Sequence, residues 1–320
     1  FMANDLEGYA LDENGTLWRT RTGGWGWTQQ GLPIGALDGE TAGLTAGVYF
    51  KTDGWVVGRS GRAFRYDLPS DSWRTVTDNL MDAPDRHWHA AAKFHVDNTT
   101  GELPIFAGEW SGGGMIVRWN GSEFQQFPIG DFALRGIAFD YENDRGYAVG
   151  DKGSFFVTTN SGNNWEKGNL PGDPERNLLC VSASSAGSLT KAVIGATDGN
   201  IFYLVNNAGT WQQSQIIAGG REVGDIVDIK IDPNGHTYAV SEGGMVLVSY
   251  DRGITFELDT FGFTKSDLLA VERITVPGQY ERNGTWVAGD KGEIHVFPDD
   301  PTRRPPISVD PESSEVGTGG

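Results

Sequence analysis

A strand–turn–strand unit recurs along almost the whole chain, and this repeat constrains the fold more than any other feature. Each copy is an apolar run, a tight turn that ends in glycine, and a second run of alternating character. Successive turn glycines lie 39 to 53 residues apart. Repeats of this length predict an array of similar units that share a continuous core. The seven copies begin at Gly8, Gly54, Pro104, Gly146, Ala192, Thr237 and Thr285, and their turn glycines are Gly15, Gly61, Gly114, Gly153, Gly199, Gly244 and Gly292.

Two further strands flank each copy, which gives about four short strands per repeat. A run of small and apolar residues precedes the unit, as in LRGIAFD, and a strand that opens on an aromatic residue follows it, as in WRTVT. No segment sustains the 3.6-residue period of an amphipathic helix. We therefore predict an all-β protein, a single β-propeller of seven four-stranded blades, with six or eight blades as the alternatives.

The two ends of the repeat are incomplete. The first copy leaves little room for an inner strand before Gly8, and the last lacks a clear outer strand after Phe297. Either PPISVD near the C-terminus supplies that strand, or strands from both termini close the ring. Residues 1–300 are expected to form the propeller, and the Pro-, Ser- and Gly-rich acidic residues 301–320 to form a tail or linker. Phe1 is not a native translation start, which indicates a processed or excised chain.

A second pattern falls between the third and fourth strands of some repeats. An Asp or Asn side chain there can accept hydrogen bonds from backbone N–H groups two residues on, glycine allows a positive φ, and an aromatic ring packs under the blade edge. The pattern therefore predicts structural turns, and a metal site is disfavoured because the best copy holds one carboxylate. That copy is Ser249, Asp251, Gly253 and Phe256; a weaker one is Thr158, Asn160, Gly162 and Trp165; a third keeps Thr20, Gly24 and Trp27.

These turns resemble the Asp-box, the S-x-D-x-G-x-T-W hairpin of sialidases and related BNR-repeat propellers. The blocks GYAVGDKGSFFVTTNSGNNWEK and TWVAGDKGEIHVF are also similar to the repeats of the photosystem II assembly factor family in that superfamily. The resemblance implies a propeller and leaves function open, because its members include glycan-cleaving enzymes, sorting receptors and non-enzymatic assembly factors. The chain departs from the sialidases in having no Arg-Ile-Pro motif, and from the assembly factors in being poor in basic residues.

The charge of the chain is strongly acidic and narrows the choice of partner. The net charge is −18, with 26 Asp to 17 Glu and 17 Arg to 8 Lys. Nucleic acid is an unsuitable partner because phosphate binding needs a basic surface, and no apolar run reaches the roughly 18 residues of a membrane helix. An acidic, lysine-poor surface is typical of salt-adapted proteins, so we expect an exported, cell-surface or virion-surface protein of a halophilic system. An ordinary acidic secreted protein is the alternative.

We expect the functional site at the mouth of the propeller channel, on the face where the loops between blades lie. The richest loop there is MDAPDRHWHAA, and Trp110 of the neighbouring blade is expected to join it in stacking a sugar ring or gripping a protein loop. The alternative is that Trp88 and His89 only pack between blades. The predicted ligand-binding residues are Arg86, His87, Trp88, Trp110, Arg176 and Arg221.

The sequence predicts a non-catalytic binding or scaffolding module for a glycan or a partner protein. It contains no G-x-S-x-G, H-E-x-x-H or P-loop motif, so no catalytic residue, metal or cofactor is predicted. The single cysteine, Cys180, lies in an apolar run that is typical of a buried, inert thiol. One alternative is a photosystem-type assembly factor. The other is a sialidase-like glycoside hydrolase, in which Arg86, Arg135, Arg176 and Arg221 are the candidates to clamp a carboxylate.

Overall fold

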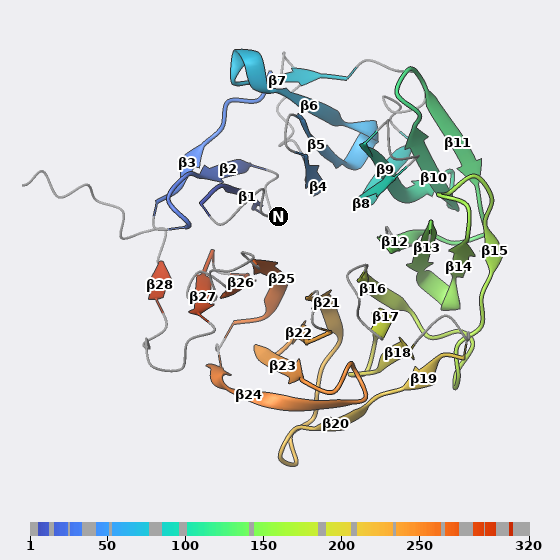
Figure 1. The fold of residues 1–320 in the computed structure, drawn as a ribbon, viewed down its shortest axis with the longest axis vertical. Coiled ribbons are helices and arrows are strands. Elements are labelled where there is room, and N and C mark those ends of the chain that lie inside the picture. The colour runs from blue at the N-terminus through green and yellow to red at the C-terminus, as the bar shows by residue number, and fades with distance from the viewer. Residues whose placement is uncertain are drawn as a thin grey trace, which may run out of the picture.

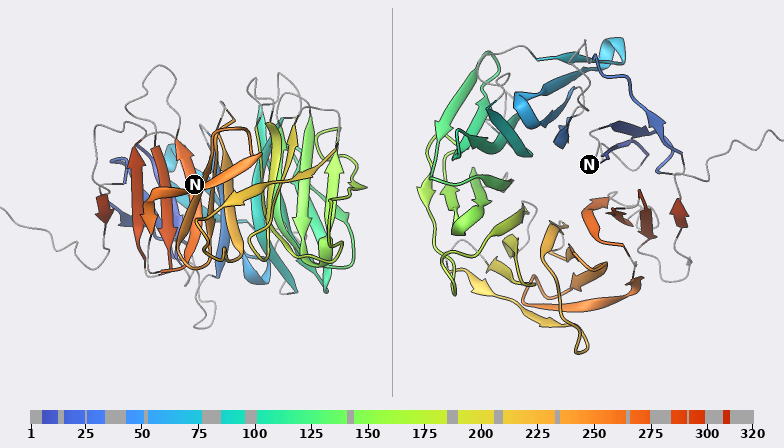
Figure 2. Two further views of the ribbon diagram at one scale, coloured as in Figure 1. Left: turned by 90° about the horizontal axis from the view of Figure 1, so that it is seen from below. Right: turned by 180° about the vertical axis from the view of Figure 1, so that it is seen from behind.

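The computed structural model arranges the chain as seven β-sheets in a ring around a central channel (Figure 1). Each sheet is built from strands that follow one another along the chain, and all but one of the paired strands are antiparallel. Figure 2 shows the ring edge-on, with the strands running through its thickness. The all-β, seven-bladed propeller predicted from the repeat is therefore confirmed.

The structure describes most of the chain. Helices in this part are limited to short 3₁₀ turns such as Arg59–Gly61 and Asp151–Gly153, and none of them is long and apolar enough to cross a lipid bilayer. The described residues are 6–12, 16–24, 26–33, 43–50, 53–76, 85–95, 101–140, 144–184, 190–205, 210–232, 235–263, 266–274, 284–290, 292–298 and 307–309.

The blades are numbered along the chain. The first strand of each blade faces the channel, except in blade 6, where the second strand in the chain, β21, does so and β20 lies at the outer edge. Blades 1 to 3 contain β1 (Gly8–Leu11), β2 (Leu17–Thr20) and β3 (Thr28–Gln29); β4 (Leu44–Tyr49), β5 (Asp53–Gly58), β6 (Ala63–Asp67) and β7 (Ser72–Thr75); and β8 (Arg86–His95), β9 (Glu102–Trp110), β10 (Gly113–Trp119) and β11 (Phe124–Pro128). Blades 4 and 5 contain β12 (Leu134–Asp140), β13 (Arg145–Gly150), β14 (Phe155–Thr158) and β15 (Glu166–Lys167); and β16 (Leu178–Ala183), β17 (Thr190–Ala196), β18 (Ile201–Val205) and β19 (Gln212–Gln213). Blade 6 contains β20 (Gln215–Ile217), β21 (Ile226–Ile231), β22 (Thr237–Ser241), β23 (Met245–Ser249) and β24 (Thr255–Phe263), and blade 7 contains β25 (Leu268–Ile274), β26 (Gly284–Gly289), β27 (Ile294–Pro298) and β28 (Ile307–Val309).

The turn between the second and third strands of a blade explains most of the repeated glycines. In blades 2, 4, 5 and 6 two successive residues have positive φ, for example Lys152 (52°) and Gly153 (67°). Such a pair matches the right-handed twist of a hairpin. Blade 3 differs from the sequence prediction, because Gly114 lies inside β10 and the positive φ values fall on Ser111 and Gly112. Gly15 lies outside the described residues.

Six clusters of buried apolar side chains fill the six seams between consecutive blades. Aromatic rings cross several of these seams. Trp55 of blade 2 packs on Phe106 of blade 3 with ring centroids 5.9 Å apart, and Tyr147 of blade 4 meets Trp211 of blade 5 edge-on at 5.6 Å. The sheets are therefore held together by side-chain packing, which is how radially repeated sheets form one core.

The seventh seam joins the last blade to the first. The rings of Trp27 and Trp286 meet edge-on with centroids 6.2 Å apart. Gly24, at φ +87°, lies against the same tryptophan, and a Cβ there would lie 1.7 Å from the Trp286 ring. β28 pairs antiparallel with β27, so PPISVD supplies the outer strand of blade 7, and residues 307–309 of the expected tail belong to that blade.

One strand departs from the regular pattern. β20, in the connection from blade 5 to blade 6, pairs parallel with the outer strand β24. The Ser214 hydroxyl also donates to the Gly253 carbonyl at 2.6 Å, and the Gln215 N–H donates to the Ile254 carbonyl at 2.9 Å. The edge of blade 6 is therefore covered, which is one way in which proteins protect an exposed strand edge.

Candidate functional site

A β-bulge near the start of each inner strand from blade 2 to blade 7 shapes the mouth of the channel. The residue before the bulge is buried, and the extra residue is turned into the channel, as bulges commonly do beside functional sites. The buried residues are Leu44, Trp88, Leu134, Leu178, Ile226 and Leu268. The extra residues, which we call the rim residues, are Thr45, His89, Arg135, Leu179, Val227 and Leu269.

The rim has two chemically different halves. Blades 2 to 4 contribute polar side chains, namely Thr45, His89 and Arg135. Blades 5 to 7 contribute apolar side chains, namely Leu179, Val227 and Leu269, and Leu269 is 51% exposed. A ligand at the mouth therefore meets an apolar surface on one side and hydrogen-bonding groups on the other.

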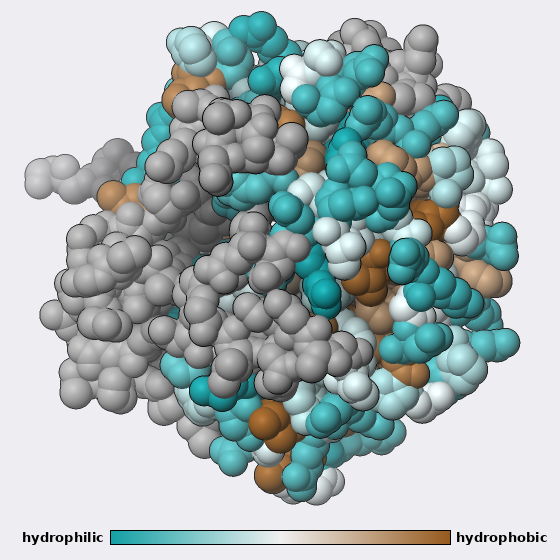
Figure 3. All heavy atoms as spheres, turned by 45° about the vertical axis from the view of Figure 1, so that its right-hand side comes forward, coloured by the Kyte–Doolittle hydropathy of each residue, from teal (hydrophilic) through white to brown (hydrophobic). Residues whose placement is uncertain are grey.

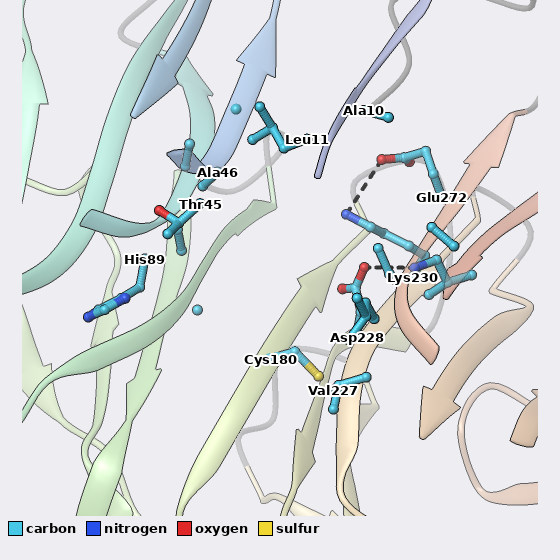
Figure 4. Close-up of a pocket in the computed structure, with 18 of the residues that line it drawn as sticks. Ala10, Leu11, Thr45, Ala46, His89, Cys180, Val227, Asp228, Lys230 and Glu272 are labelled. Carbon is cyan, nitrogen blue, oxygen red and sulfur yellow. Dashed lines mark hydrogen bonds and ion pairs between the residues drawn. The ribbon is translucent and has the colours of Figure 1, made fainter. Parts of the chain in front are cut away.

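Behind the rim the channel has a volume of about 470 Å³. Many of its walls are small, with Ala46, Gly47, Ala90, Ala91, Gly136 and Ala270 lining it. Figure 4 shows Thr45 and His89 on one side of this space and the charged side chains of blades 6 and 7 on the other. Small residues on the inner strands leave the centre of the ring open. The volume of this space is in the range of many ligand sites.

Three charged residues form a cluster on the wall of blades 6 and 7. The Lys230 ammonium lies 3.7 Å from the Glu272 carboxylate, and Asp228 accepts N–H groups from Ile229 at 2.8 Å and from Val271 at 2.9 Å. Burial raises the pKa of Asp228, and the charge of Glu272 raises the pKa of Lys230. Burial opposes ionisation of Glu272, but nearby positive charge, including Lys230, outweighs it and lowers the pKa of that carboxyl.

The opposite wall carries a second polar cluster. Arg135 makes a bidentate ion pair with Asp151, at 2.9 and 2.6 Å, in the turn after β13. His89 Nε2 lies 3.4 Å from Arg135 Nη1 and 3.9 Å from Glu109. Burial, followed by the positive charge of Arg135, lowers the pKa of His89 to about 4. His89 is therefore neutral near pH 7, and Asp151 already compensates the charge of Arg135.

Residues 81–84 of the loop predicted to bind ligand lie outside the described residues, and the rest of it is mostly the start of β8, where Asp85 and Arg86 cluster with Trp110 in blade 3. The Arg86 guanidinium lies over the Trp110 ring at 4.6 Å, and the Trp110 indole N–H donates to Asp85 at 2.6 Å. Trp110 comes from β9, the strand paired with β8, and so from the same blade and not from a neighbouring one. Trp88 is completely buried between blades 2 and 3, where it has no surface to offer a ligand. His87 accepts the Ser60 N–H at 3.2 Å and so ties blade 3 to blade 2.

The four arginines considered as a carboxylate clamp do not all face the channel. Arg135 is the one that lines it among the described residues. Arg176 is half-buried in the connection to blade 5, where its carbonyl accepts the Gly153 N–H at 2.9 Å. Arg221 is exposed in the connection to blade 6, beside a separate cavity of about 510 Å³.

The turns after the third strand of a blade lie at the end of the ring opposite the channel mouth, and side-chain to backbone hydrogen bonds close them. Asp251 accepts the N–H of Thr255, four residues on and not two as expected, at 2.8 Å. The Ser249 hydroxyl donates to Asp251 and accepts the Gly253 N–H, both at 2.8 Å. Corresponding bonds join Thr158, Asn160, Gly162 and Asn164, and Thr20 accepts from Gly24. Phe256 is buried, and Trp165 packs edge-on against Phe139.

Sequence reasoning missed the charged wall of the channel. Asp228, Lys230 and Glu272 lie in IVDIKID and LLAVERITV, which are the inner-strand runs of blades 6 and 7. The equivalent runs of the other blades hold mainly small and apolar residues. The charged residues in the inner-strand runs of blades 6 and 7 were therefore the sequence feature that could have indicated this wall. Cys180, by contrast, is buried as expected, and burial raises the pKa of its thiol. No group of three or more His, Cys, Asp or Glu side chains among the described residues could hold a metal ion.

Comparison with solved structures shows the same architecture in proteins of several kinds. YCF48 bound to D1 peptide superimposes with a TM-score of 0.69 at 18% identity, covering 93% of this chain and 92% of that one. An ancestral GH74 enzyme gives 0.68 at 15% identity, with 92% of this chain and 43% of the enzyme covered. The WD40 β-propeller domain of Doa1 gives 0.66 at 12% identity, with 94% and 92% covered. No protein-family model and no curated protein sequence matches the chain. The resemblance expected from the repeats is thus confirmed at the level of fold.

Proposed function

We propose that the protein is a non-catalytic binding or scaffolding module that holds a segment of a partner protein at the rim and in the central channel. The observation that carries this proposal is the channel of about 470 Å³ behind a rim that is apolar on one half and polar on the other. An extended segment presents both backbone hydrogen-bonding groups and side chains, so it can satisfy both halves at once.

A protein segment is favoured over a glycan because the aromatic residues expected to stack a sugar ring are largely engaged by the protein itself. Trp88 is buried, one face of Trp110 is covered by Arg86, and the Trp110 N–H is bonded to Asp85. Binding of a sugar ring requires a free aromatic face. The fold likeness to YCF48 bound to D1 peptide and to a WD40 domain also supports a protein partner.

The proposed setting is the surface of a cell or virion, or the exterior of a cell, in a halophilic system. What supports it is the net charge of −18 and the scarcity of lysine. The face in Figure 3 is mainly hydrophilic where it is described, with apolar side chains scattered over it. A strongly charged surface keeps a protein dispersed at high salt.

Selection from a random 12-residue peptide display library against the immobilised protein tests the function. We expect the selected peptides to bind through the rim, so Leu269→Asp should weaken their affinity at least about tenfold, which is about 1.4 kcal/mol. Ile217→Asp is the matched control, because Ile217 on β20 is 47% exposed but lies away from the channel. Affinity is measured by fluorescence anisotropy of the resynthesised peptides.

Equal loss in both variants, or unchanged binding in Leu269→Asp, would contradict the proposed site. The absence of catalysis is tested with a panel of oligosaccharides. Release of reducing ends by the wild type that disappears in Glu272→Gln would make the protein a glycoside hydrolase and overturn the proposed function. Glu272 is the appropriate position because its carboxylate lines the channel.

A further inference from the structure

On the wall of blades 6 and 7, the charged side chains that the structure describes do not balance. Two carboxylates, Asp228 and Glu272, share the single ammonium group of Lys230 on the wall of blades 6 and 7. The other basic side chain among the described lining residues, Arg135, is held by Asp151 in a bidentate pair on the opposite wall. Among the described side chains, the wall of blades 6 and 7 therefore carries one carboxylate more than it has ammonium groups.

Asp228 is the carboxylate with acceptor capacity left for a further cation, because Lys230 lies next to Glu272. Each of its oxygens accepts one backbone N–H, from Ile229 and Val271. A carboxylate can accept about four hydrogen bonds, so each oxygen retains acceptor capacity. Burial raises the pKa of Asp228 more than Lys230 and the two backbone N–H groups lower it, so these groups compensate its ionised form only in part.

The neighbouring inner strand leaves space beside Asp228. Ala270 precedes Val271, whose N–H binds Asp228, and Ala270 occupies in β25 the place that Asp228 occupies in β21, directly after the bulge residue. Both residues line the channel, and Ala270 is exposed to it. The rim residues Val227 and Leu269 come directly before Asp228 and Ala270 in β21 and β25, so a side chain that enters from the mouth passes them first.

We infer that the channel accepts a basic side chain, lysine or arginine, from the bound segment, while an adjacent apolar side chain of that segment rests on Leu179, Val227 and Leu269. This inference deepens the proposed function and rests on it. The cation pairs with Asp228 and makes the charge of the wall neutral. An opposite charge within about 4–6 Å also favours the ionised form of a buried carboxylate.

A basic segment also fits the charge of the whole molecule. The net charge of −18 attracts cationic segments and repels anionic ones at long range. An acidic side chain in the channel would meet Asp228 and Glu272 without a free cation among the described residues that line it. The neutral form of His89 adds no charge on the other wall near pH 7.

The test uses the peptides selected on the wild-type protein. We expect them to share a lysine or arginine at one fixed position, and replacement of that residue by norleucine to weaken binding at least about tenfold. Ala270→Lys places an ammonium group of the protein beside Asp228 and should reduce affinity similarly. Asp131→Asn is the matched control, because Asp131 is an exposed acid outside the channel and should leave affinity unchanged.

Two further variants keep the test independent of folding defects. Asp228→Asn removes the excess charge but places an amide NH₂ group against a backbone N–H. The peptide affinity of Glu272→Gln is therefore measured as well. Unfolding curves of both variants show whether they fold. Peptides that bind at the rim, as shown by loss in Leu269→Asp, but carry no fixed basic residue would overturn this inference and leave the proposed function standing. Failure to select any rim-binding peptide would overturn both. Binding of free spermidine with equal affinity for wild type and Leu269→Asp, in place of peptide binding, would also count against a protein segment.

Discussion

Trp88 and Leu44 occupy the same place in neighbouring blades, each directly before a β-bulge and each buried. Trp88 lies in the sequence beside two histidines and an arginine, a composition typical of a ligand-binding surface, and this composition predicts a binding residue. When the inner strands are aligned on their bulges, Trp88 falls in the column of Leu44, Leu134, Leu178 and Leu268. Aligning the strands by their small residues shifts this column by one position. The sequence contains no sign of a bulge, so the side of the strand on which Trp88 lies could not be predicted.

His89 makes the stability of the ring depend on pH. Its pKa is about 4 in the folded protein and about 6.5 in an unfolded chain. The unfolded state therefore binds more protons between these values, and stability falls as the pH falls from 6.5 to 4. The charged and titratable groups that act on His89 are Arg135, Glu109, His87, Asp151 and Arg59. We expect His89→Gln to abolish roughly 2–3 kcal/mol of this loss, measured by urea unfolding from pH 7 to pH 4.

His95→Gln is the control for the histidine prediction. His95 lies at the other end of the same strand, β8. The slope of stability against pH is measured for this variant as well, so that the effect of His89→Gln can be compared with that of replacing another histidine of the strand. Equal slopes in wild type and His89→Gln would show that His89 takes up its proton equally in both states.

At the scale of the element, the turns after the third strand act between blades. Gly24, Gly162 and Gly253 each lie against the second strand of the preceding blade, where a Cβ would approach Trp286, Ile105 and Val193 respectively. The sequence pattern predicted these turns, because the residues that close them are adjacent in the chain. It could not predict their role at the seams, since the opposing residues lie in the preceding blade, and for Gly24 at the other end of the chain.

We expect Gly24→Ala to destabilise the protein more than Gly243→Ala. Both glycines have positive φ, +87° and +82°, so both variants lose about 1–2 kcal/mol through backbone strain. A Cβ at Gly243 meets open space, whereas one at Gly24 meets the Trp286 ring. Overpacking of this kind costs about 1–3 kcal/mol in addition. Chemical unfolding of the two variants measures the difference, and equal losses would show that the seam between blades 7 and 1 adapts freely.

At the scale of the whole molecule, the sequence predicted the ring well and its centre poorly. The repeat of glycines and aromatic residues is local and occurs many times, so seven blades could be counted without any knowledge of contacts. The centre depends on which residues of seven separate strands face one another. Asp228 and Glu272 are 44 positions apart, and their sharing of Lys230 follows only from the packing of β21 against β25.

The acidic surface predicts that salt stabilises the protein. At 0.1 M ionic strength exposed charges act over about 10 Å, and at 1 M over about 3 Å. Screening should therefore relieve the repulsion within a chain of net charge −18, and we expect the melting temperature to rise by several degrees from 0.1 to 1 M NaCl. The rise should shrink at pH 4, where carboxylates are partly protonated. A fall with salt would show that ion pairs such as Arg21–Asp71 outweigh the repulsion.

Among the strands that the structure describes, β28 completes blade 7 from the C-terminal side and blade 1 uses N-terminal residues, so no described sheet is shared between the two ends of the chain. In its strand pairing, the described part of the molecule is a series of seven modules, each of which forms its own sheet. New ends could be opened at other module boundaries and the old ones joined by a linker. The boundary between the fifth and sixth modules is the exception, since β20 runs from one to the edge of the other and would be severed from its partner.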